Sequence, residues 1–526
     1  MALPAWLPHL VAAATLALLP PFAAADAVPS PPSPDISLRL AALGEWLWEL
    51  WELIAPGGKL HPAGFLEHKG HLVVEALLVL LIAYLVWQPR SSPSKKADER
   101  LTEKEIDQLC EEWQPEPLCP EIESFPEVEK PLLATSVLGH HIEVDGEKLL
   151  NMVSTDFLGL STSEHIKDVC RATINKYGVG SCGPRGFYGT VDVHLQLEES
   201  ISEFMGTQET IIYSYDMATA ASVLPAFANA KDVIVCDEAV HYPIQNGCTL
   251  SRAKVLKFKH NDMGDLERLL VKVAAEDKKL RKPLNRRFIV VEAIYHNTGE
   301  LAPLDAIHAL AAKHKYRLAV DESLAIGVLG PKGRGACEHF GLPPGGAEIV
   351  FASMGNALAS AGGFCTGARE VADHQRLAGQ GYCFSASQPP YLATSARAAL
   401  EAVAGDGEGR RQVAKGAAQL RRELGRVAGL EVVGSHERDL LSPVVFLRLK
   451  DAPESSVEAR RRLSELADWV RRRQRVLITI PISSPIEWRD WGPAIRIVVT
   501  ARHGEGELRG LAKGLEEGLK ELSKKW

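Results

Sequence analysis

Short apolar runs alternate with longer amphipathic stretches between residues 210 and 365. The runs are rich in β-branched residues, and most of the stretches between them have the length and periodicity of helices. In chain order the runs read TIIYSY, DVIVCD, AKVLKFK, RFIVVEAI, RLAVDES and EIVFAS. Apolar strands that alternate with helices predict a mostly parallel sheet with helices on both faces.

The pattern changes on both sides of this region. After about residue 400, charged helical stretches (GRRQVAKGAAQLRREL and SSVEARRRLSELADWVRRR) flank the short strands PVVFLRL, VLITI and AIRIVVTA. Ahead of the sheet, HHIEVDGEKLLNMVSTDFLGL predicts a short hairpin followed by a turn into a helix. We therefore expect a large α/β domain over residues 136–400 and a small α+β domain over residues 401–526.

Two apolar segments lie within residues 1–70, which we interpret as an N-terminal arm. The first 25 residues have the apolar character and small-residue end of a signal peptide but no early Lys or Arg, so a cleaved signal and a loosely apolar arm both remain open. Residues 37–58 follow a helical period and contain Trp46, Trp48 and Trp51. Because tryptophan favours membrane interfaces, this segment predicts an interfacial helix or one packed against a partner's membrane span.

A third apolar segment predicts a membrane crossing. Residues 72–87 contain a single charge, Glu75, and are followed by the basic linker QPRSSPSKK. A spanning helix needs about 17–25 residues, so the segment is at the short end, and a buried core helix is the alternative. We predict one transmembrane helix at residues 71–88 with its basic side in the cytosol, followed by a linker over residues 89–135 that is acidic and Pro-rich from residue 101 onward.

Composition excludes several classes of protein. The chain of 526 residues is 46% hydrophobic and 24% charged, as is ordinary for folded proteins, and its net charge is −8. It has no basic stripe with interleaved aromatics, so nucleic acid is not an expected partner. The nine cysteines form no C-x-x-C pair, which argues against a zinc site and a disulfide framework and favours a reducing compartment.

Four clusters fall where predicted strands end, at residues 236–247, 290–304, 319–335 and 351–367, and open α/β sheets bind ligands there. Three of these clusters contain four motifs: D-E-x-x-H at 237–241, V-D-E at 320–322, G-V-L-G-x-x-G-R-G at 327–335 and A-L-x-S-x-G-G at 357–363. Over residues 135–525 their order and wording resemble the α-oxoamine synthases, which are fold-type I pyridoxal-phosphate (PLP) enzymes that condense an amino acid with an acyl-CoA. The resemblance implies an aspartate aminotransferase-like large domain and a small C-terminal domain.

The resemblance also assigns the site, position by position. The lysine that would hold PLP is replaced by Asn356, and no lysine occurs between Lys332 and Lys415. An amide cannot form the required imine. Asp321 matches the partner of the pyridine nitrogen and His241 the histidine stacked on the ring, but the second histidine position is Leu324.

The implied phosphate site departs from the family as well. In YSYDMATA, Asp216 stands where a glycine is usual, and a carboxylate repels a phosphate. In the second segment that would hold the phosphate, Ser353-Met354-Gly355, only Ser353 has a hydroxyl. We therefore expect no bound PLP, no metal and no catalytic residue in this chain. His241, Asp321 and Ser353 are then remnants, and the His241–Asp321 pair is satisfied by its neighbours.

Enzymes of this family are dimers whose active sites lie at the subunit interface. A lysine-less chain with an N-terminal membrane segment resembles the lysine-less subunits of eukaryotic serine palmitoyltransferases. The resemblance rests on Asn356, the apolar segment 72–87, the arm LTEKEIDQLCEEWQPEPL and the loop SCGPRGFYGTVDVH. It implies a PLP-binding catalytic partner, condensation of L-serine with palmitoyl-CoA to 3-ketosphinganine, and a single-pass protein of the endoplasmic reticulum with a cytosolic globular part. Small regulatory membrane subunits are further partners that it allows.

By the same resemblance, the loop at 181–190 approaches the partner's active site, with Cys182, Gly183, Arg185 and Tyr188 as its interface residues. Glycines permit close approach of two backbones, and Arg185 could meet a carboxylate or phosphate. The alternative for Cys182 is a small buried hydrophobe. The turn SASQPP at 385–390 matches a loop beside the substrate entrance or is an ordinary helix lead-in. At the level of the whole chain, a pure membrane scaffold and a stand-alone acyltransferase are the competing readings.

Overall fold

The computed structural model describes residues 77–84, 102–118, 131–280, 285–343, 345–434, 436–482, 484 and 486–526. The chain divides into two units, Met1–Ile122 and Glu123–Trp526, which are described separately. In the first unit, residues 77–84 form an exposed helix. Helix α4 (Glu103–Glu112) begins with a capping box between Thr102 and Glu105 and buries none of its residues, as expected for an arm rather than a core.

The described part of the chain contains no helix with both the length and the apolarity needed to cross a bilayer. Of the span predicted at 71–88, only residues 77–84 are described. The remainder of that segment and the apolar arm at 1–70 lie outside the described residues, so the predicted crossing stays a prediction.

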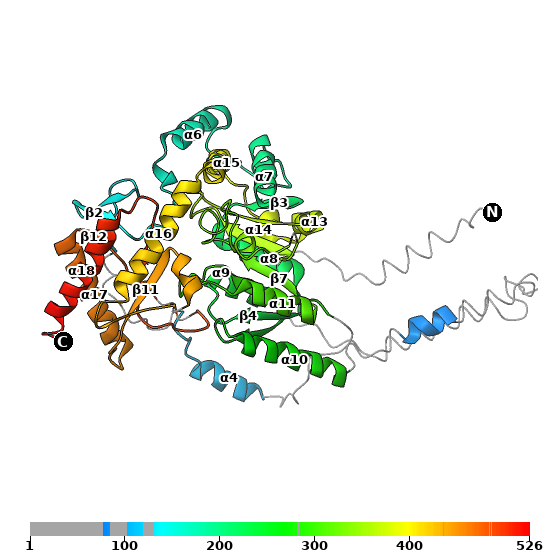
Figure 1. Ribbon diagram of the computed structural model, residues 1–526. Helices are drawn as coiled ribbons and strands as arrows, with labels where there is room; N and C mark the ends of the chain where they lie inside the picture. The colour runs from blue at the N-terminus through cyan, green and yellow to red at the C-terminus, as the bar shows by residue number, and fades with distance from the viewer. Residues whose placement is uncertain are drawn as a thin grey trace, which may run out of the picture. The chain divides into compact units, whose positions relative to one another are not determined.

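The second unit is built on a seven-stranded sheet with the order β3-β9-β8-β7-β6-β4-β5 (Figure 1). The strands are β3 (Glu209–Tyr213), β4 (Val233–Asp237), β5 (Lys254–Phe258), β6 (Arg287–Glu292), β7 (Arg317–Asp321), β8 (Ile349–Ser353) and β9 (Gly363–Gly367). Strands β5, β4, β6, β7 and β8 are parallel, whereas β9 is antiparallel to both β8 and β3. The mostly parallel sheet and its six predicted strands are confirmed.

Strand β9 was not among the predicted strands, because its sequence GFCTG read as the end of a glycine-rich loop. Gly363 has to lie there: a Cβ atom at this position would approach Oγ1 of Thr219 to 2.2 Å. The strand therefore packs directly under helix α8 (Asp216–Phe227), which starts at the edge of the sheet where the candidate site lies. A strand selected for close helix packing loses the bulky residues that signal a strand in sequence.

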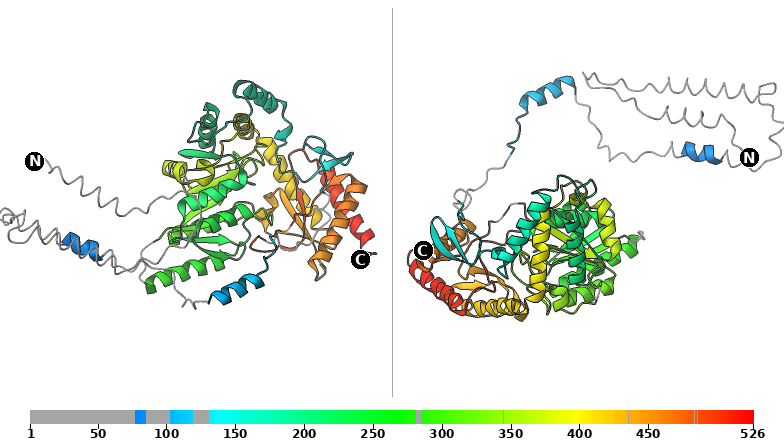
Figure 2. Two further views of the ribbon diagram at one scale, coloured as in Figure 1. Left: turned by 180° about the vertical axis from the view of Figure 1, so that it is seen from behind. Right: turned by 90° about the horizontal axis from the view of Figure 1, so that it is seen from above.

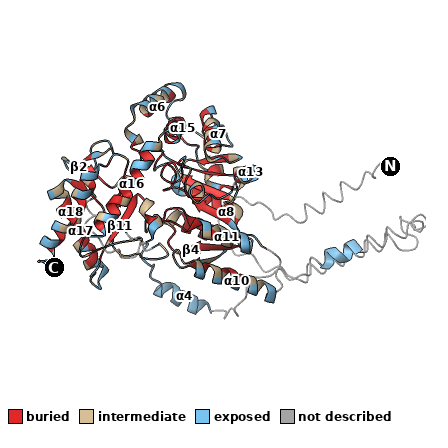
Figure 3. Ribbon diagram, viewed as in Figure 1, coloured by how far each residue is buried: buried red, intermediate tan, exposed pale blue. Residues whose placement is uncertain are grey.

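Helices cover the sheet, and their outward faces are the exposed ones (Figure 3). They are α6 (Glu164–Tyr177), α7 (Asp192–Met205), α8, α9 (Tyr242–Ser251), α10 (Met263–Leu280), α11 (Leu304–His314), α12 (Ala336–His339), α13 (Arg369–Ala378), α14 (Gln380–Cys383) and α15 (Pro390–Gly405). The core between sheet and helices is large and apolar, and it fully buries Tyr213, Tyr295 and Phe351. Burial of this apolar area is the main force that fixes the strand ends in place.

A second core lies in the C-terminal part, beside the large domain (Figure 2). Strands β10 (Leu430–Val432), β11 (Val444–Leu449) and β13 (Ile495–Val498) form an antiparallel sheet. Helices α16 (Gly407–Leu424), α17 (Ser456–Gln474) and α18 (Glu505–Leu522) supply further apolar residues to this core. The predicted α+β texture is confirmed.

The predicted hairpin is present as β1 (His141–Val144) and β2 (Glu147–Asn151). It belongs with the C-terminal elements, because β2 pairs in parallel with β12 (Val476–Leu477) and Leu150 and Met152 lie in the second core. The small domain is thus made from both ends of the globular unit. The predicted large domain over residues 136–400 included this hairpin. The sequence pattern could not show its pairing with β12, because the paired residues are more than 300 positions apart.

Candidate functional site

Asn356 lies in the loop that connects β8 to β9, at the carboxyl end of the parallel strands. Its side-chain amide is fully engaged within the chain. Nδ2 donates to the carbonyl of Ser323 at 2.9 Å, and Oδ1 accepts from Oγ1 of Thr155 at 2.7 Å. The amide is therefore a structural bridge between three segments, and it has no nucleophilic atom to offer.

A cavity of about 230 Å³ opens beside Asn356. It collects the ends of β7 and β8, the start of α8 and the segment before α9. Its polar lining is formed by Asp216, Thr219, His241, His296, Asp321, Ser323, Ser353 and Asn356. The residues that the resemblance assigned to the PLP site thus lie together around one cavity. Leu324 is the exception, because it is buried in the core with 1% of its surface exposed.

Asp216 occupies the place where helix α8 begins and carries its carboxylate toward the β8–β9 loop. Oδ2 accepts from the Ser353 hydroxyl, and Oδ1 accepts from the backbone N–H of Gly362 at 2.7 Å. The hydroxyl at the end of β8 and the backbone N–H just before β9 are donors that could otherwise hold an anion from outside the chain. Here the chain supplies the anion itself. Desolvation raises the pKa of Asp216, and the two hydrogen bonds counteract that rise.

His241 lies between two carboxylates. Its Nδ1 is 3.2 Å from Glu292 and its Nε2 is 3.7 Å from Asp321, and its ring stacks on that of His296 at a centroid distance of 5.4 Å. Burial lowers the pKa of His241, but the charges of Glu292 and Asp321 outweigh it and bring the pKa to about 9. Burial raises the pKa of Asp321, which the positive charge of His241 opposes. The expected pair is present as an ion-pair contact, but at 3.7 Å it is too long for a hydrogen bond, and among the described residues Nδ1 of His241 has no hydrogen-bond partner.

Glu292 is a residue that the sequence analysis missed. Its two oxygens accept from the backbone N–H groups of His241 and His296, at 2.6 and 2.9 Å. These bonds fix the loops after β4 and β6 against each other. The available signal was the acidic residue at the end of the apolar strand RFIVVE. A carboxylate buried there is costly unless it is hydrogen-bonded or paired, so it indicates bonding partners nearby.

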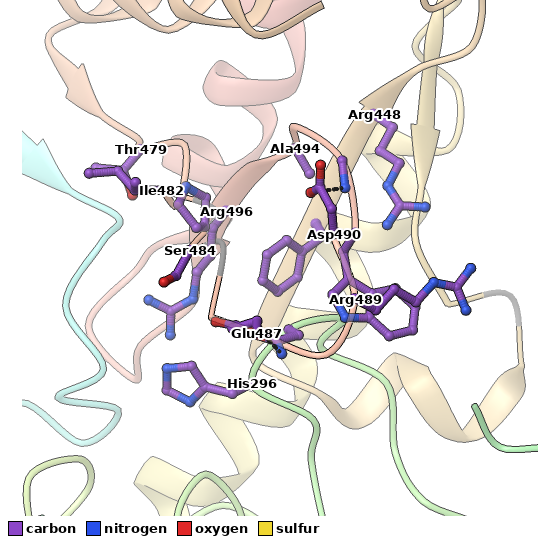
Figure 4. Close-up of a pocket in the computed structure, with 15 residues that line it drawn as sticks. His296, Arg448, Thr479, Ile482, Ser484, Glu487, Arg489, Asp490, Ala494 and Arg496 are labelled. Carbon is purple, nitrogen blue, oxygen red and sulfur yellow. Dashed lines mark hydrogen bonds between the residues drawn. The ribbon is translucent and has the colours of Figure 1, made fainter. Parts of the chain in front are cut away.

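Arg496 is a second missed residue. It reaches from β13 into a neighbouring cavity of about 200 Å³ and lies near His296 (Figure 4). Among the described residues, its Nε and Nη2 atoms have no hydrogen-bond partner, and burial lowers its pKa to about 10. A single arginine in the apolar strand AIRIVVTA was the only sequence signal. The arrangement leaves a cation facing a cavity next to the His241 cluster.

In the D-E-x-x-H motif, Asp237 and His241 contact different partners. Asp237 accepts from His260 at 2.9 Å, and the other ring nitrogen of His260 is 3.0 Å from Glu300. Burial lowers the pKa of His260, yet the two carboxylates raise it to about 9. Asp237 and Glu300 come from β4 and from the bridge after β6, so this ion cluster holds the sheet edge together.

We expect alkaline pH to weaken the fold through His260 and His241. Both histidines have a folded pKa near 9, above the unfolded value of about 6.5, so their stabilisation is complete below pH 6.5 and disappears as the pH rises through 9. Each contributes on the order of 2–3 kcal/mol. Urea unfolding between pH 6 and pH 9.5 should show the loss, and His260→Gln should remove about half of the pH dependence. An unchanged slope in this variant would contradict the assignment.

The loop at 181–190 is fixed from inside by Arg185. Its guanidinium makes two 2.9 Å bonds to Glu198 of α7, a third to Thr190, and lies over the ring of Tyr382. Only 8% of Arg185 is exposed. The predicted carboxylate partner exists, but it belongs to this chain, so Arg185 is a residue that holds the loop.

The turn at 385–390 is bound to the same loop. The Ser387 N–H donates to the carbonyl of Gly183 at 2.8 Å, and its hydroxyl donates to Gly189. Gly189 permits this fold of the chain, because a Cβ atom there would lie 1.8 Å from the Gly183 carbonyl oxygen. His194 adds a bond to the Gln388 carbonyl at 2.7 Å. The loop at 181–190 and the turn at 385–390 are therefore one structural element.

The outward side of this element is apolar and exposed. Cys182 and Tyr188 both have positive φ, at 57° and 66°, and the Tyr188 side chain is entirely in solvent. Ser214 donates to the Ala386 carbonyl, which brings the start of α8 to the same place. We call the exposed apolar residues of these joined segments the loop face: Val179, Phe187, Tyr188, Tyr215, Met217 and Phe384. Cys182 is exposed beside them, so it is not the buried hydrophobe of the alternative reading.

Comparison with known proteins agrees with this fold. The family described as "Aminotransferase class I and II" matches residues 147–515. "Long chain base biosynthesis protein 1b" of Oryza sativa subsp. japonica is 45% identical over 85% of this chain and 91% of its own length. "Serine palmitoyltransferase 1" of Dictyostelium discoideum is 38% identical over 73% of this chain and 79% of its own.

Among solved structures, "Sphingomonas wittichii Serine palmitoyltransferase" superposes with a TM-score of 0.67 at 22% identity, covering 75% of this chain and 93% of that one. At this identity the likeness shows the fold alone, which is the fold-type I PLP-dependent transferase fold. The family match and the relatives above 30% identity go further. The chain belongs to the aminotransferase class I and II family, together with the long chain base biosynthesis protein 1 and serine palmitoyltransferase 1 proteins.

Proposed function

We propose that this chain is a non-catalytic but required subunit of serine palmitoyltransferase. In this proposal it pairs with a related PLP-binding subunit, and the complex condenses L-serine with palmitoyl-CoA to 3-ketosphinganine. The observation that carries the proposal is the occupied anion site, in which the Asp216 carboxylate takes the hydroxyl of Ser353 and the N–H of Gly362. The names of the relatives point to the same enzyme.

The residues around the cavity do not fit PLP. A phosphate would meet the Asp216 carboxylate at the donors it needs, and Asn356 provides an amide that is already bonded to Thr155 and Ser323. Leu324, which stands at the position of the second ring-side histidine, is apolar and buried in the core. Three features of one site thus oppose the cofactor, and PLP is assigned to the partner.

The loop face supports a partner subunit. It exposes six large apolar residues on segments that are tied together by hydrogen bonds, beside the candidate site. Large apolar side chains exposed on neighbouring segments are typical of protein interaction sites. The rigid anchoring through Arg185 and Glu198 means that the face is preformed, so binding costs little ordering.

We further propose that the chain is anchored in the endoplasmic reticulum membrane by the apolar segment at 71–88, with the globular unit in the cytosol. The support is the sequence of that segment and the basic residues after it. Acyl-CoA and long-chain product both partition into lipid, which suits an anchored enzyme.

Co-purification tests the proposal. The epitope-tagged chain is expressed in its native membrane, solubilised gently and analysed for what accompanies it. We expect a stoichiometric relative that carries lysine at the position of Asn356, together with PLP absorbance and serine-dependent condensation. The chain purified alone should show neither. Full activity of the chain by itself, or recovery of copies of itself only, would overturn the proposal.

Tyr188→Ala should weaken the partner's binding without affecting the fold. The side chain is 104% exposed, so it stabilises nothing within this chain. A central aromatic at an interface contributes about 2 kcal/mol, which corresponds to about a 30-fold loss of affinity. The measurement is the dissociation constant of the two purified subunits. Val271→Ala, a 52% exposed residue on α10, is the matched control and should leave it unchanged.

The competing function is a pure membrane scaffold that contributes nothing to the active site. A variant of Cys182 distinguishes this function from the proposed one. If the chain only anchors and stabilises its partner, Cys182→Ser leaves the kinetics of an assembled complex untouched. If the loop borders the partner's active site, the KM for serine or palmitoyl-CoA changes while assembly and thermal stability do not. The exposed position of Cys182 makes this a change of surface chemistry alone.

A further inference from the structure

Two histidines and a carboxylate meet far from the cavity described above, where the hairpin joins the last helix. His140 and His141 stand at the start of β1, and Glu507 lies in the first turn of α18. Each offers one ligand atom, and the three atoms lie within 4.8 Å of one another. Nothing in the proposed function uses this cluster.

The fold holds two of the three groups in place. Glu507 closes a capping box, in which its Oε2 accepts from the Gly504 N–H at 2.8 Å, so its Oε1 is directed to His140 Nε2 at 3.0 Å. The His140 ring packs against the His503 ring at a centroid distance of 5.4 Å. His503 itself is locked, because its nitrogens are bonded to Thr500 and Asn151. It therefore supports His140 from behind and is not a ligand.

His141 is the exposed member of the cluster. Its ring meets that of His140 edge-on, with centroids 4.7 Å apart. Ligands bound to zinc at about 2.0–2.2 Å lie roughly 3.2–3.5 Å from one another. A small rotation of the exposed His141 side chain closes the remaining distance, whereas His140 and Glu507 are already 3.0 Å apart.

We propose that His140, His141 and Glu507 bind a divalent transition metal ion, Zn²⁺, with water in the fourth position. Two imidazoles and one carboxylate are a zinc ligand set, whereas Mg²⁺ and Ca²⁺ prefer oxygen ligands. The ion joins β1 to α18, the first and last elements of the small domain. The site is independent of the proposed function, since it shares no residue with the cavity or the loop face.

Metal analysis of the full chain, purified with an epitope tag that contains no histidine, tests the proposal. After incubation with ZnCl₂ and removal of free ion, the wild type should retain one zinc per chain. His141→Ala should lose at least tenfold in zinc affinity, because it removes a ligand outright. His165→Ala, an exposed histidine on α6, is the matched control and should bind as the wild type does. MgCl₂ should not compete.

Thermal unfolding supplies a readout that does not depend on recovery of the ion. Zinc should raise the unfolding midpoint of the wild type and of His165→Ala, and should raise that of His141→Ala by clearly less at the same zinc concentration. Glu507→Gln keeps an oxygen for the capping bond to Gly504 and should reduce the zinc-dependent shift. Equal zinc content in the wild type and His141→Ala, or no shift in the wild type, would overturn the site.

Discussion

Arg185→Met should destabilise the chain by about 3–5 kcal/mol and abolish condensation by the complex. The substitution leaves Glu198 buried, with only the backbone N–H of Ile212 as a donor at 3.1 Å. An uncompensated buried carboxylate costs this much, because its desolvation is no longer offset by the guanidinium. The loop face then loses its anchor, and with it the surface that we propose as the partner's binding site. Urea unfolding of the purified chain and serine-dependent turnover of the complex are the two measurements.

Two further variants show whether charge or shape matters. Arg185→Lys keeps the charge but cannot make the bidentate pair, reach Thr190 and cover Tyr382 at once, so an intermediate loss is expected. The double variant Arg185→Met with Glu198→Gln removes both charges and keeps an acceptor for Ile212, so it should be more stable than Arg185→Met alone. If Arg185→Met changes stability by less than about 0.5 kcal/mol, the ion pair does not hold the loop.

The sequence predicted the sheet because its strands are apolar on both faces and separated by helical stretches. It could not predict β9, whose residues are small for the sake of close packing against α8. It also could not place the hairpin in the small domain, because the pairing of β2 with β12 depends on tertiary contacts between distant residues. The pattern of apolar and polar residues along the chain predicts local structure. Strand β9 and the position of the hairpin depend instead on tertiary packing.

The candidate site was predictable in its residues but not in their partners. Motif positions identified His241, Asp321, Asp216 and Asn356, and the structure gathers all four around one cavity. The motifs gave no sign that Glu292 would join His241, or that Arg185 would pair with Glu198 inside the chain. Charged residues were interpreted as facing a ligand or partner, whereas burial selects for charges that neutralise each other.

Under the proposed function, a chain without the cofactor must still satisfy the polar groups that would otherwise contact it. Asp216 accepts from the donors of the anion site, and Asn356 bridges Thr155 and Ser323. Each of these two side chains fills a hydrogen-bonding position that would otherwise be unpaired at a cost of about 1–3 kcal/mol. Both positions are thus part of the internal structure of the chain, so we expect that reversing one of them is not enough to allow PLP to bind.

Asn356→Lys alone should therefore bind no PLP, whereas Asn356→Lys combined with Asp216→Gly should bind it. A carboxylate about 4 Å from a phosphate charge costs roughly 4 kcal/mol at an effective dielectric constant near 20, which is about a thousandfold in affinity. Removing it also frees the Ser353 hydroxyl and the Gly362 N–H. Absorbance of lysine-bound PLP, followed during titration of the purified chain and confirmed by borohydride trapping, measures both variants.

Asp216→Asn is the control that separates charge from space, since it keeps the side-chain volume and removes the charge. With Asn356→Lys it should bind PLP more tightly than the single variant and more weakly than the glycine combination. Leu324 remains apolar in all of these chains, so we expect none of them to turn over serine. An absorbance band in Asn356→Lys alone would mean that the Asp216 carboxylate yields to the phosphate, and the occupied anion site would no longer explain why the cofactor is absent.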